Sequence, residues 1–570
     1  MGSRDTYKWT ALSNTTLGVL MASLDSSIVI ISLPAIFRGI ALDPLAPGNI
    51  DYLLWTLMGY MVCTAVLVVT LGRLGDIYGR VRMYNAGFAV FTLASIALSL
   101  TPGTGPRAAL YLITMRVVQG IGGACLMANS AAILTDAFPA RQRGLAMGIN
   151  MVAAIAGAFI GLIVGGLLAD IHWRLIFWIN VPIGTFGTVW AYWKLRDTGV
   201  RKSATIDWWG NLTFAFGLIA LLVGITYGIQ PYGGHSMGWT NPFVLGALGL
   251  GALLLAVFVL VEQRVREPMF NLKLFGIRAF AAGNVAGLLA AIGRGGLQFM
   301  LIIWLQGIWL PLHGYSFEST PLWAGIYMLP LTAGFFVAGP VSGWLSDRFG
   351  ARYLATVGML VGALAFGLLI LLPVDFTYRT FGLILLMSGI GSGLFSAPNT
   401  TAIMNSVPAQ DRGQASGMRA TFMNSGQVLS IGLFFSLMIA SLSTTLPKAI
   451  LAGLTAQGVP VTVAQKIASA PPVANLFAAF LGYNPMKQLI PAAVLGALPG
   501  RGAATLTGTQ FFPNLISAPF KQGLAITFLL SMVAYVIAAI ASWLRGDRYI
   551  NAARGHRGSP FPPAPARLTP

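Results

Sequence analysis

Long apolar blocks separated by short polar segments run along most of this chain of 570 residues. A helix needs roughly 20 apolar residues to cross the hydrocarbon layer of a bilayer, and the blocks have about this length. The pattern therefore predicts fourteen membrane-spanning helices. They are expected near residues 14–37, 51–71, 84–101, 108–134, 144–169, 175–194, 208–229, 241–261, 277–310, 321–345, 353–373, 379–404, 415–442 and 522–544.

The composition agrees with this pattern. Hydrophobic residues make up 56% of the chain and charged residues only 9%, whereas an ordinary soluble domain carries roughly 25% charged residues. So few charges cannot cover the surface of a globular protein of this size. The predicted fold class is therefore an all-α polytopic membrane protein.

The formal net charge of +19 first suggests a nucleic-acid partner, but the positions of the basic residues favour another interpretation. With the N-terminus in the cytoplasm, the inner short loops hold most of the Arg and Lys residues. The outer short loops hold only Arg38, Arg107, Arg174 and Arg379. This asymmetry follows the positive-inside rule. It predicts a plasma-membrane protein with both termini in the cytoplasm, in contact with lipids and not with nucleic acid.

Two regions interrupt the pattern of spans. Residues 443–520 form a long outer segment of low charge, which is expected to be a partly helical cap. The basic, Pro-rich tail at 546–570 is expected to be disordered. The remaining predicted parts are a cytoplasmic N-terminus at 1–13, a six-span bundle at 14–196, two inserted spans at 207–262 and a second six-span bundle at 276–545.

An internal repeat supports this division. The loop sequence at 138–148 is FPARQRGLAMG, and a similar loop at 407–417, displaced by 269 residues, is VPAQDRGQASG. A second pair, GRLGDIYGR at 72–80 and GWLSDRFGA at 343–351, has an offset of 271. Two charged loop motifs at nearly one offset predict two related six-helix bundles with two inserted helices. Such duplications are typical of transporters whose substrate site lies between the repeats.

The motifs resemble one known family. The loop at 72–82, GRLGDIYGRVR, is similar to the signature loop between the second and third spans of the major facilitator superfamily. The fourteen predicted spans, LDSSIVIISLP at 24–34 and WRLIFWINVPIG at 173–184 resemble its fourteen-span drug:proton antiporter branch. The resemblance implies a monomeric secondary transporter that exports hydrophobic or amphipathic small molecules by alternating access. The proton gradient would drive it, without a cofactor.

The resemblance also implies a cytoplasmic gate at the signature loop. Glycines permit the tight reversal, and Asp76 can cap or complement the positive end of the following helix. An alternative is that the loop only fixes the topology of the chain. The gate residues are Gly72, Arg73, Asp76, Gly79 and Arg80, with the weaker second copy Asp347 and Gly350.

Asp25 is the only acidic residue well inside a predicted span, and Arg116 is a basic residue inside another. Arg116 matches the arginine that the family associates with proton coupling, and the resemblance places Asp25 on the same cavity. A nearby charge in a low-dielectric interior shifts the protonation equilibrium of a carboxyl group strongly. We therefore predict that the two residues couple transport to protons; a static ion pair is the alternative.

Arg294 lies in the middle of another predicted span, at residues 277–310. An arginine there costs at least about 2.5–3.5 kcal/mol, so it is usually kept for a function. The repeat offset of 269 makes its position equivalent to that of Asp25, so both residues are expected to face the central cavity. We predict that it pairs with Asp25 or binds an anionic part of the substrate, whereas contact with lipid headgroups or simple packing is the alternative. The predicted substrate cavity comprises Arg294, Gln298, Trp304 and Gln306.

The fifth span departs from the antiporter pattern of the family. It contains the four glycines of that motif, Gly157, Gly161, Gly165 and Gly166, but Leu162 stands where the family has a proline. The glycines permit close helix packing, and the kink that proline causes is not expected. This difference keeps a facilitator or a proton symporter as alternatives to antiport.

Other functions have weaker support in the sequence. The sequence GHSMG at 234–238 matches the nucleophile motif of serine hydrolases, but it lies in a short loop between two spans and not on an α/β sheet. The chain contains no Walker loop and no HExxH motif, so neither ATP hydrolysis nor a metal site is expected. The prediction is a protein that is not an enzyme; a sensor or scaffold that binds a partner through residues 443–520 remains an alternative.

Overall fold

The computed structural model describes residues 3–43, 46, 48–139, 142–197, 207–235, 237–408, 411–482, 484–498 and 501–546. In these parts the chain is almost wholly helical, and its only β-type pairing is the isolated bridge between Tyr232 and His235. Fourteen helices within them are long and apolar enough to cross a membrane. The predicted all-α polytopic fold is therefore confirmed. The predicted tail lies outside the described residues beyond Gly546.

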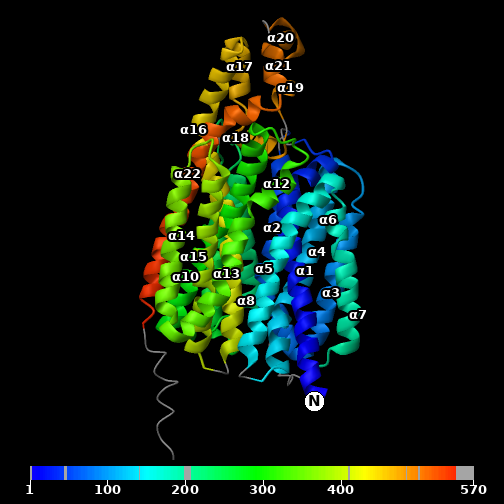
Figure 1. Cartoon of the computed structure of the whole chain (residues 1–570), viewed down its shortest axis with the longest axis vertical. Coiled ribbons are helices and arrows are strands. Elements are labelled where there is room, and N and C mark those ends of the chain that lie inside the picture. Colours follow the sequence, from blue (N-terminus) through cyan, green and yellow to red (C-terminus); the bar gives the residue numbers. More distant parts are fainter. Residues whose placement is uncertain are drawn as a thin grey trace, which may run out of the picture.

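The first bundle contains seven helices that make six spans (Figure 1). Helix α1 packs on α5, α2 packs on α4, and α3 packs on α4 and α7. The short α6 and α7 together form the sixth span. The helices are α1 (Ser3–Gly39), α2 (Asn49–Tyr78), α3 (Arg80–Ser99), α4 (Gly105–Ala137), α5 (Arg143–Ile171), α6 (Leu175–Trp178) and α7 (Asn180–Lys194).

The second bundle repeats this packing. Helix α10 packs on α16 as α1 packs on α5, α13 packs on α15 as α2 packs on α4, and α14 packs on α15 as α3 packs on α4. Helix α10 continues into a π-helical turn, η3, and α11. The elements are η2 (Leu272–Gly276), α10 (Arg278–Trp304), η3 (Leu305–Trp309), α11 (Leu310–Leu312), α12 (Thr320–Tyr327), α13 (Leu329–Phe349), α14 (Ala351–Leu371), α15 (Tyr378–Ser406), α16 (Arg412–Ala456) and α22 (Phe511–Trp543).

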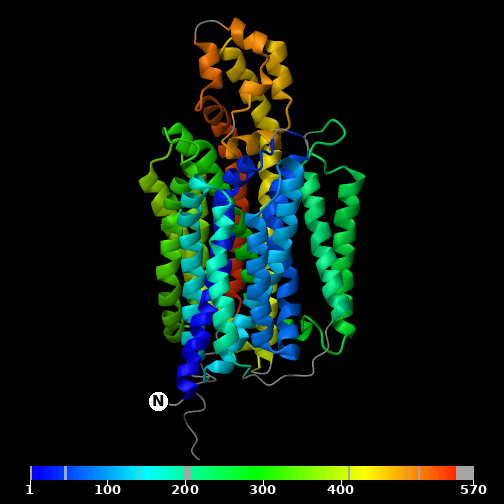
Figure 2. The same cartoon turned by 90° about the vertical axis from the view of Figure 1, so that its right-hand side faces the viewer.

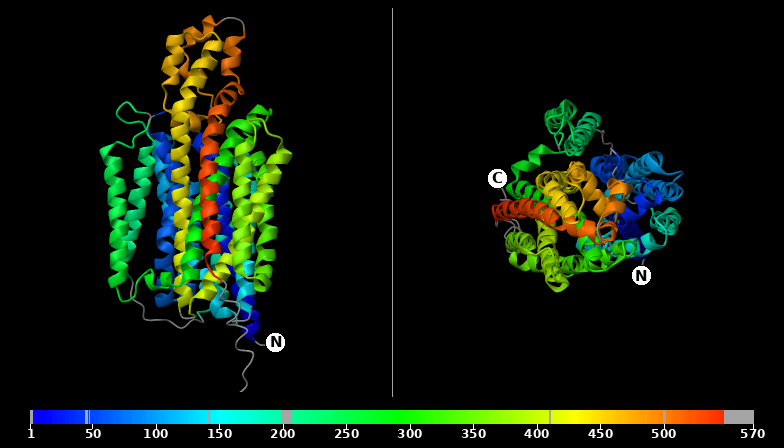
Figure 3. Two further views of the ribbon diagram at one scale, coloured as in Figure 1. Left: turned by 90° about the vertical axis from the view of Figure 1, so that its left-hand side faces the viewer. Right: turned by 90° about the horizontal axis from the view of Figure 1, so that it is seen from above.

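The inserted pair, α8 (Trp208–Gly228) and α9 (Pro242–Arg264), forms a helical hairpin at the edge of the molecule (Figures 2 and 3). Asp207 caps α8 by accepting a hydrogen bond from the Gly210 N–H at 2.7 Å, and Asn241 caps α9 by accepting one from the Phe243 N–H at 2.9 Å. Side-chain caps of this kind satisfy N–H groups that have no partner within the helix. Of the two helices, α8 lies against α2 and α16.

A helical cap stands on the end of the bundle opposite the N-terminus (Figures 1 and 2). We call that end the cap face and the other end the N-terminal face. The cap consists of the ends of α16 and α22 and the short helices α17 (Val461–Ala468), α18 (Pro472–Phe480), α19 (Met486–Leu489), α20 (Ala492–Ala497) and α21 (Gly502–Thr507). Helix α18 is fully buried, and its Phe480 ring lies 5.6 Å from that of Phe299 in α10.

Candidate functional site

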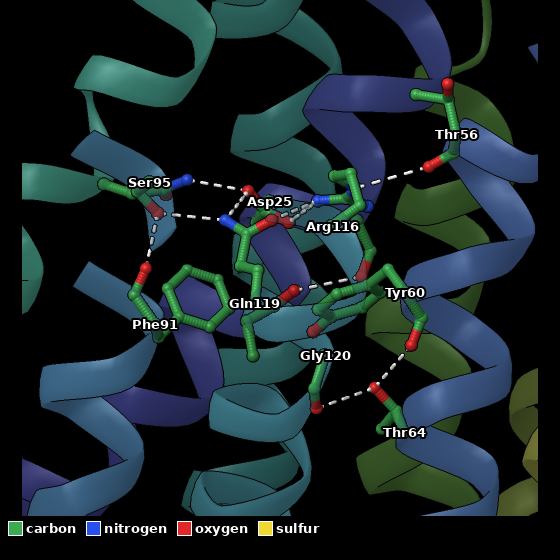
Figure 4. A network of polar contacts seen from close by, with 12 residues as sticks. Asp25, Thr56, Tyr60, Thr64, Phe91, Ser95, Arg116, Gln119 and Gly120 are labelled. Atoms are coloured by element: carbon green, nitrogen blue, oxygen red, sulfur yellow. Dashed lines mark hydrogen bonds and ion pairs between the residues drawn. The ribbon is translucent and has the colours of Figure 1, made fainter. Parts of the chain in front are cut away.

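A buried polar cluster lies inside the first bundle, around the carboxylate of Asp25 in α1 (Figure 4). Asp25 is 0% exposed. Its Oδ2 accepts a hydrogen bond from Nη1 of Arg116 in α4 at 2.5 Å, and the two groups form an ion pair. Its Oδ1 accepts from Nε2 of Gln119 at 3.0 Å and from Nδ2 of Asn180 at 2.7 Å. Three donors from α4 and α7 therefore hold this carboxylate.

The guanidinium group of Arg116 is held just as closely. The residue is 1% exposed, and its Nη1 also donates to Oε1 of Gln119 at 2.6 Å. Its Nε donates to the carbonyl of Thr56 in α2 at 3.4 Å, and its Cζ lies 4.5 Å from the ring centre of Tyr60. A desolvated cation over an aromatic ring gains about 2 kcal/mol. Gln119 also donates to Ser95 of α3 at 2.9 Å, so five helices share the cluster.

The arrangement has a defined chemical property. Ionised Asp25 and Arg116 neutralise each other in a space that water does not reach. Protonation of Asp25 would leave Arg116 as an uncompensated buried charge, and breaking such a pair by removing one partner costs about 3–5 kcal/mol. Any movement that hydrates Arg116 is therefore linked to the protonation of Asp25. The coupling role of the two residues stays a prediction.

Asp25 and Arg116 were predicted as a pair from the sequence, but their partners Gln119 and Asn180 were not. Gln119 lies three residues after Arg116, which places both side chains on one side of α4. Asn180 is one of the few polar residues in the apolar sixth span. Polar residues inside spans usually face the bundle interior, so this signal was present in the sequence. What the sequence does not contain is the packing of α7 against α1 that brings Asn180 to Asp25.

Arg294 lies apart from this cluster. It is exposed in the middle of α10, and its Cζ lies 5.5 Å from the ring centre of Phe335 in α13. Gln298, one turn further along α10, is half-buried. Within the described parts of the chain, Arg294 makes no ion pair and no contact with Asp25. The repeat therefore relates a buried acidic position to an exposed basic one, and it does not bring the two together.

The other two predicted cavity residues lie in packed surroundings. Trp304 is 1% exposed, and its ring lies 4.9 Å from that of Phe376. Gln306 is also 1% exposed, and its Nε2 donates to the carbonyl of Ile31 in α1 at 3.0 Å. Gln306 belongs to the π-helical turn η3, a local geometry that is frequent at functional sites. In this conformation Gln306 therefore joins the two bundles and does not line an open cavity.

The signature loop forms an ion-pair network on the N-terminal face. Nε of Arg80 donates to Oδ1 of Asp76 at 2.8 Å, and Nη1 of Arg80 contacts Oδ1 of Asp136 in α4 at 2.7 Å. Gly79 makes the reversal between α2 and α3 at a φ of 113°, which favours glycine. The expectation that Asp76 itself caps α3 is wrong, because Asp197, three residues beyond the end of α7, accepts from the Val81 N–H at 2.9 Å. Asp76 is occupied by Arg80 instead. The alternative, that Asp76 complements the positive end of α3, stays a prediction.

Arg73 and the second copy of the motif have separate surroundings. Arg73 donates to the carbonyl of Glu267 at 2.8 Å and to that of Pro268, in the segment between α9 and η2. Gly72 is half-buried, and a Cβ there would lie 3.5 Å from Ala128 of α4. In the second copy, Gly350 makes the reversal between α13 and α14 at a φ of 84°. The side chain of Asp347 lies outside the described residues.

The four glycines of the fifth span serve two interfaces. Gly157, Gly161 and Gly165 lie against α1; a Cβ at Gly161, for example, would lie 2.6 Å from the Leu24 carbonyl oxygen. Gly166 lies against the backbone of α12 in the other bundle, where its Cβ would overlap Leu322. Close backbone approach of this kind needs small residues. The motif therefore packs α5 within its own bundle and against the second one.

Leu162 belongs to the second of these interfaces. A Cβ at Gly325 of α12 would lie 2.5 Å from the Leu162 carbonyl oxygen, and the Leu162 side chain is 2% exposed. Helix α5 runs unbroken from Arg143 to Ile171. Together with the hydrogen bond from Gln306 to Ile31, the contact between α5 and α12 holds the bundles together in the half near the cap face.

The loop with the hydrolase-like sequence connects α8 to α9. Ser236 lies outside the described residues. His235 and Tyr232 exchange backbone hydrogen bonds at 3.0 and 3.1 Å, which makes the loop a tight turn. The strand-to-helix geometry that this nucleophile motif needs is not what the described part of the loop forms.

Comparisons with known proteins agree with this architecture. The chain is similar to "Tetracenomycin C resistance and export protein" of Streptomyces glaucescens, with 29% identity over 94% of this chain and 91% of that protein. It is 32% identical to "Multidrug resistance protein Stp" of Mycobacterium tuberculosis (strain CDC 1551 / Oshkosh), over 76% of each chain. These two relatives are named for resistance or export.

Two solved structures share the fold. One is a bacterial homolog to the human lysosomal transporter Spinster, inward-facing and unoccupied; its TM-score is 0.54 and its identity 16%, over 94% of this chain and 97% of that one. The other is a peptide transporter POT in complex with sulfate, with a TM-score of 0.55, 16% identity, and 86% and 99% coverage. The family model described as the Major Facilitator Superfamily matches residues 15–431. The chain therefore belongs to the Major Facilitator Superfamily.

Proposed function

We propose that this protein is a proton-coupled exporter of hydrophobic or amphipathic small molecules. The N-terminal face would lie in the cytoplasm, where the positive-inside rule places the basic loops. The protein would lie in the plasma membrane and work as a monomer, without a cofactor. The names of the relatives, which refer to tetracenomycin C export and multidrug resistance, support this substrate class.

The observation that carries the proposal is the buried pair of Asp25 and Arg116. An ion pair between residues that are 0% and 1% exposed is costly to desolvate. A protein that only needed a stable bundle would lose little by replacing both with apolar residues. Ionisable residues inside a membrane protein commonly mark proton and substrate pathways. The pair therefore supports transport that depends on a proton.

The proposed cycle uses the exclusion of water around this pair. Proton binding to Asp25 removes the charge that compensates Arg116, so the protonated state favours a conformation in which Arg116 is hydrated or meets an anionic group. Release of the proton restores the pair and the packed conformation. The protein then alternates between two conformations. Protonation of Asp25 shifts the conformational equilibrium by the same coupling free energy by which the conformational change shifts the protonation of Asp25.

The contacts between the bundles define what must move. On the cap-face side, α5 meets α12 and Gln306 meets α1. On the N-terminal face, α2 and α16 lie together, and Gly417 approaches Val69. We propose that the ion pairs of Arg80 with Asp76 and Asp136 keep α2, α3 and α4 together while the bundles rock. Export requires the contacts on the cap-face side to open.

Arg294 is the proposed contact for an anionic or electron-rich part of the substrate. It is exposed at mid-length of α10, and within the described residues no carboxylate compensates it. An aromatic ring beside a guanidinium group suits a planar amphipathic molecule. A cation binding directly beside Arg294 would be repelled.

The test uses inverted membrane vesicles that hold an inside-acid pH gradient. Tetraphenylphosphonium, a neutral drug and tetracenomycin C are added in turn, and proton release is followed with a pH-sensitive dye. Substrate-dependent proton release is expected in the wild type and in Asp375→Asn, a control at an acidic residue whose side chain is 86% exposed. It should be absent in Asp25→Asn. Equal proton release by Asp25→Asn and the wild type would disprove the coupling role of Asp25.

Leu162 keeps a second function open. The unbroken helix α5 carries no proline at the position where antiporters of this family have one. A facilitator would equilibrate labelled substrate across the membrane without moving protons. Equilibration at the same rate with and without a pH gradient, in the wild type, would favour the facilitator over the exporter.

A further inference from the structure

Two buried carboxylates meet at the base of the inserted hairpin, outside the site described above. Asp207 stands at the start of α8 and is 5% exposed, and Glu262 stands near the end of α9 and is 3% exposed. One oxygen of each carboxylate has a backbone partner. Asp207 Oδ1 accepts from the Gly210 N–H at 2.7 Å, and Glu262 Oε2 accepts from the Phe270 N–H at 2.9 Å.

The other oxygen of each carboxylate points to the same place. A Cβ placed on Gly210 would lie 2.7 Å from Oε1 of Glu262 and even closer to Oδ2 of Asp207. Both oxygens are buried, and neither receives a hydrogen bond from any described residue. Two carboxylate oxygens are both acceptors, so they can satisfy each other only through a shared proton. Two like charges this close in a buried site do not both persist.

The charged surroundings do not neutralise a doubly ionised pair. Arg73 of α2 is the cation whose charge acts on Glu262. Its guanidinium group is directed to the Glu267 and Pro268 carbonyls. Among the described side chains of α16, the uncharged Gln414 forms a hydrogen bond with this segment. On the hairpin itself, Arg264 and Arg266 are exposed, so water screens their charges.

The segments next to the carboxylate pair are connected to both bundles. Thr70 of α2 donates a hydrogen bond to Asn211 of α8. Gln414 of α16 donates to the Pro268 carbonyl at 2.8 Å, the same carbonyl that accepts from Arg73. The segment between α9 and η2 therefore bridges α2 of the first bundle and α16 of the second on the N-terminal face.

An aromatic cluster packs this segment against three helices. Glu262 fixes the backbone of Phe270, whose ring lies 5.9 Å from Phe214 in α8 and 5.4 Å from Phe258 in α9. The same ring lies 5.4 Å from Phe422 in α16. Phe270 is 3% exposed, so it cannot shift without disturbing all three helices.

We infer that Asp207 and Glu262 form a second proton-binding site, which controls the bridge between α2 and α16 on the N-terminal face. With one proton bound, the two carboxyl groups share a hydrogen bond and hold the hairpin ends together. When the proton leaves to water on that face, the two negative charges repel each other. The end of α9 and the start of α8 then separate, Phe270 loses its acceptor, and the bridge loosens.

Proton binding is tested directly by infrared difference spectroscopy of the full chain in liposomes, taken from acidic to alkaline buffer. The wild type should lose a carboxyl C=O band as the pH rises. Asp207→Asn and Glu262→Gln should each lack this band, and Asp197→Asn, on the same face, should keep it. A band that persists in both hairpin variants would overturn the proton site. This readout needs no transport, so it stands even where the proposed export fails.

Control of the bridge is tested with spin labels at Tyr78→Cys and Asp411→Cys, after replacement of Cys63 and Cys125. This part rests on the proposed alternating-access function. The closed population of the wild type should fall with rising pH, by about tenfold for each pH unit above the midpoint. Glu262→Gln keeps an acceptor for the Phe270 N–H and should stay closed at every pH. The same pH dependence in this variant and in the wild type would refute control by the pair.

Discussion

Replacement of Asp25 and Arg116, singly and together, gives the sharpest test of the central ion pair. Asp25→Asn keeps the shape of the side chain and acceptors for Gln119 and Asn180, but it leaves Arg116 without a counter-charge. Arg116→Gln leaves the carboxylate unpaired in the same way. Since both residues are essentially unexposed, each single change should lower the free energy of unfolding by about 3–5 kcal/mol.

The double variant separates the pair from its surroundings. It leaves no ionised group within this cluster, and replacing both members of a buried pair is often nearly neutral. We expect Asp25→Asn with Arg116→Gln to be more stable than either single variant, with a coupling energy of at least about 3 kcal/mol. Part of the remaining loss comes from the contact of Arg116 with Tyr60, worth about 2 kcal/mol when desolvated.

Unfolding in mixed micelles with increasing SDS, followed by fluorescence of the 14 tryptophans, measures these values. The exposed control, Asp375→Asn, should change the free energy of unfolding by less than about 1 kcal/mol. High salt should weaken the exposed contact between Asp375 and His313, which are 3.2 Å apart, but not the buried pair. Additive effects of the two single changes, or a loss below about 1 kcal/mol for each, would refute the view that the pair is desolvated and coupled.

Three further changes test other parts of the structure. Gly166→Leu should prevent closure on the cap-face side, because even a Cβ at this position overlaps the backbone of Leu322. The closed state should lose about 1–3 kcal/mol, so cysteines introduced near α12 should become at least about tenfold more accessible to polar reagents. Unchanged accessibility of these cysteines would contradict this prediction. Arg73→Gln removes charged donors to the Glu267 and Pro268 carbonyls and should increase accessibility on the N-terminal face, measured by the same labelling. Arg294→Gln should change stability by less than about 0.5 kcal/mol and reduce transport of amphipathic anions, but not of tetraphenylphosphonium, whereas Arg294→Lys should retain anion transport; equal losses for all substrates would contradict the anion contact.

The architecture was predictable because the membrane restricts it. Backbone groups must be satisfied within each span, so apolar blocks of the right length can only be helices. The repeated loops at 138–148 and 407–417 then indicated two bundles. The pairing of α10 with α16, which follows that of α1 with α5, is what this repeat implies.

The candidate site was predictable only in part. Asp25 and Arg116 stand out as charges in apolar spans, and the structure joins them. The contacts of Asp25 with Asn180 and of Arg116 with Thr56 depend on how helices distant in sequence pack, which no local pattern contains. Arg294 shows the limit of the repeat. Equivalent positions in two bundles share a place on the backbone but not the burial of their side chains.

The hairpin pair was overlooked for a different reason. Asp207 and Glu262 lie at the ends of the inserted spans, where acidic residues are expected to face water. They are buried because residues 265–271 fold back across the hairpin. No local pattern in the sequence predicts this path of the chain. The cap that Asp197 provides for α3 was not predicted for a similar reason, because Asp197 lies in the segment after α7, distant in sequence from α3.

Helices α16 and α22 run without a break from the membrane region into the cap, over 45 and 33 residues. Two continuous helices, each with one internal proline (Pro447 and Pro519), therefore connect the cap to the second bundle (Figure 3). Helix α18 fastens the cap to that bundle again, through Phe480 on α10 and Phe477 on Phe435 of α16. A small tilt of the second bundle would thus displace the tip of the cap further than it displaces the helices within the membrane. An antibody bound to the tip of the cap would therefore oppose the tilting of the second bundle more effectively than one bound near the membrane.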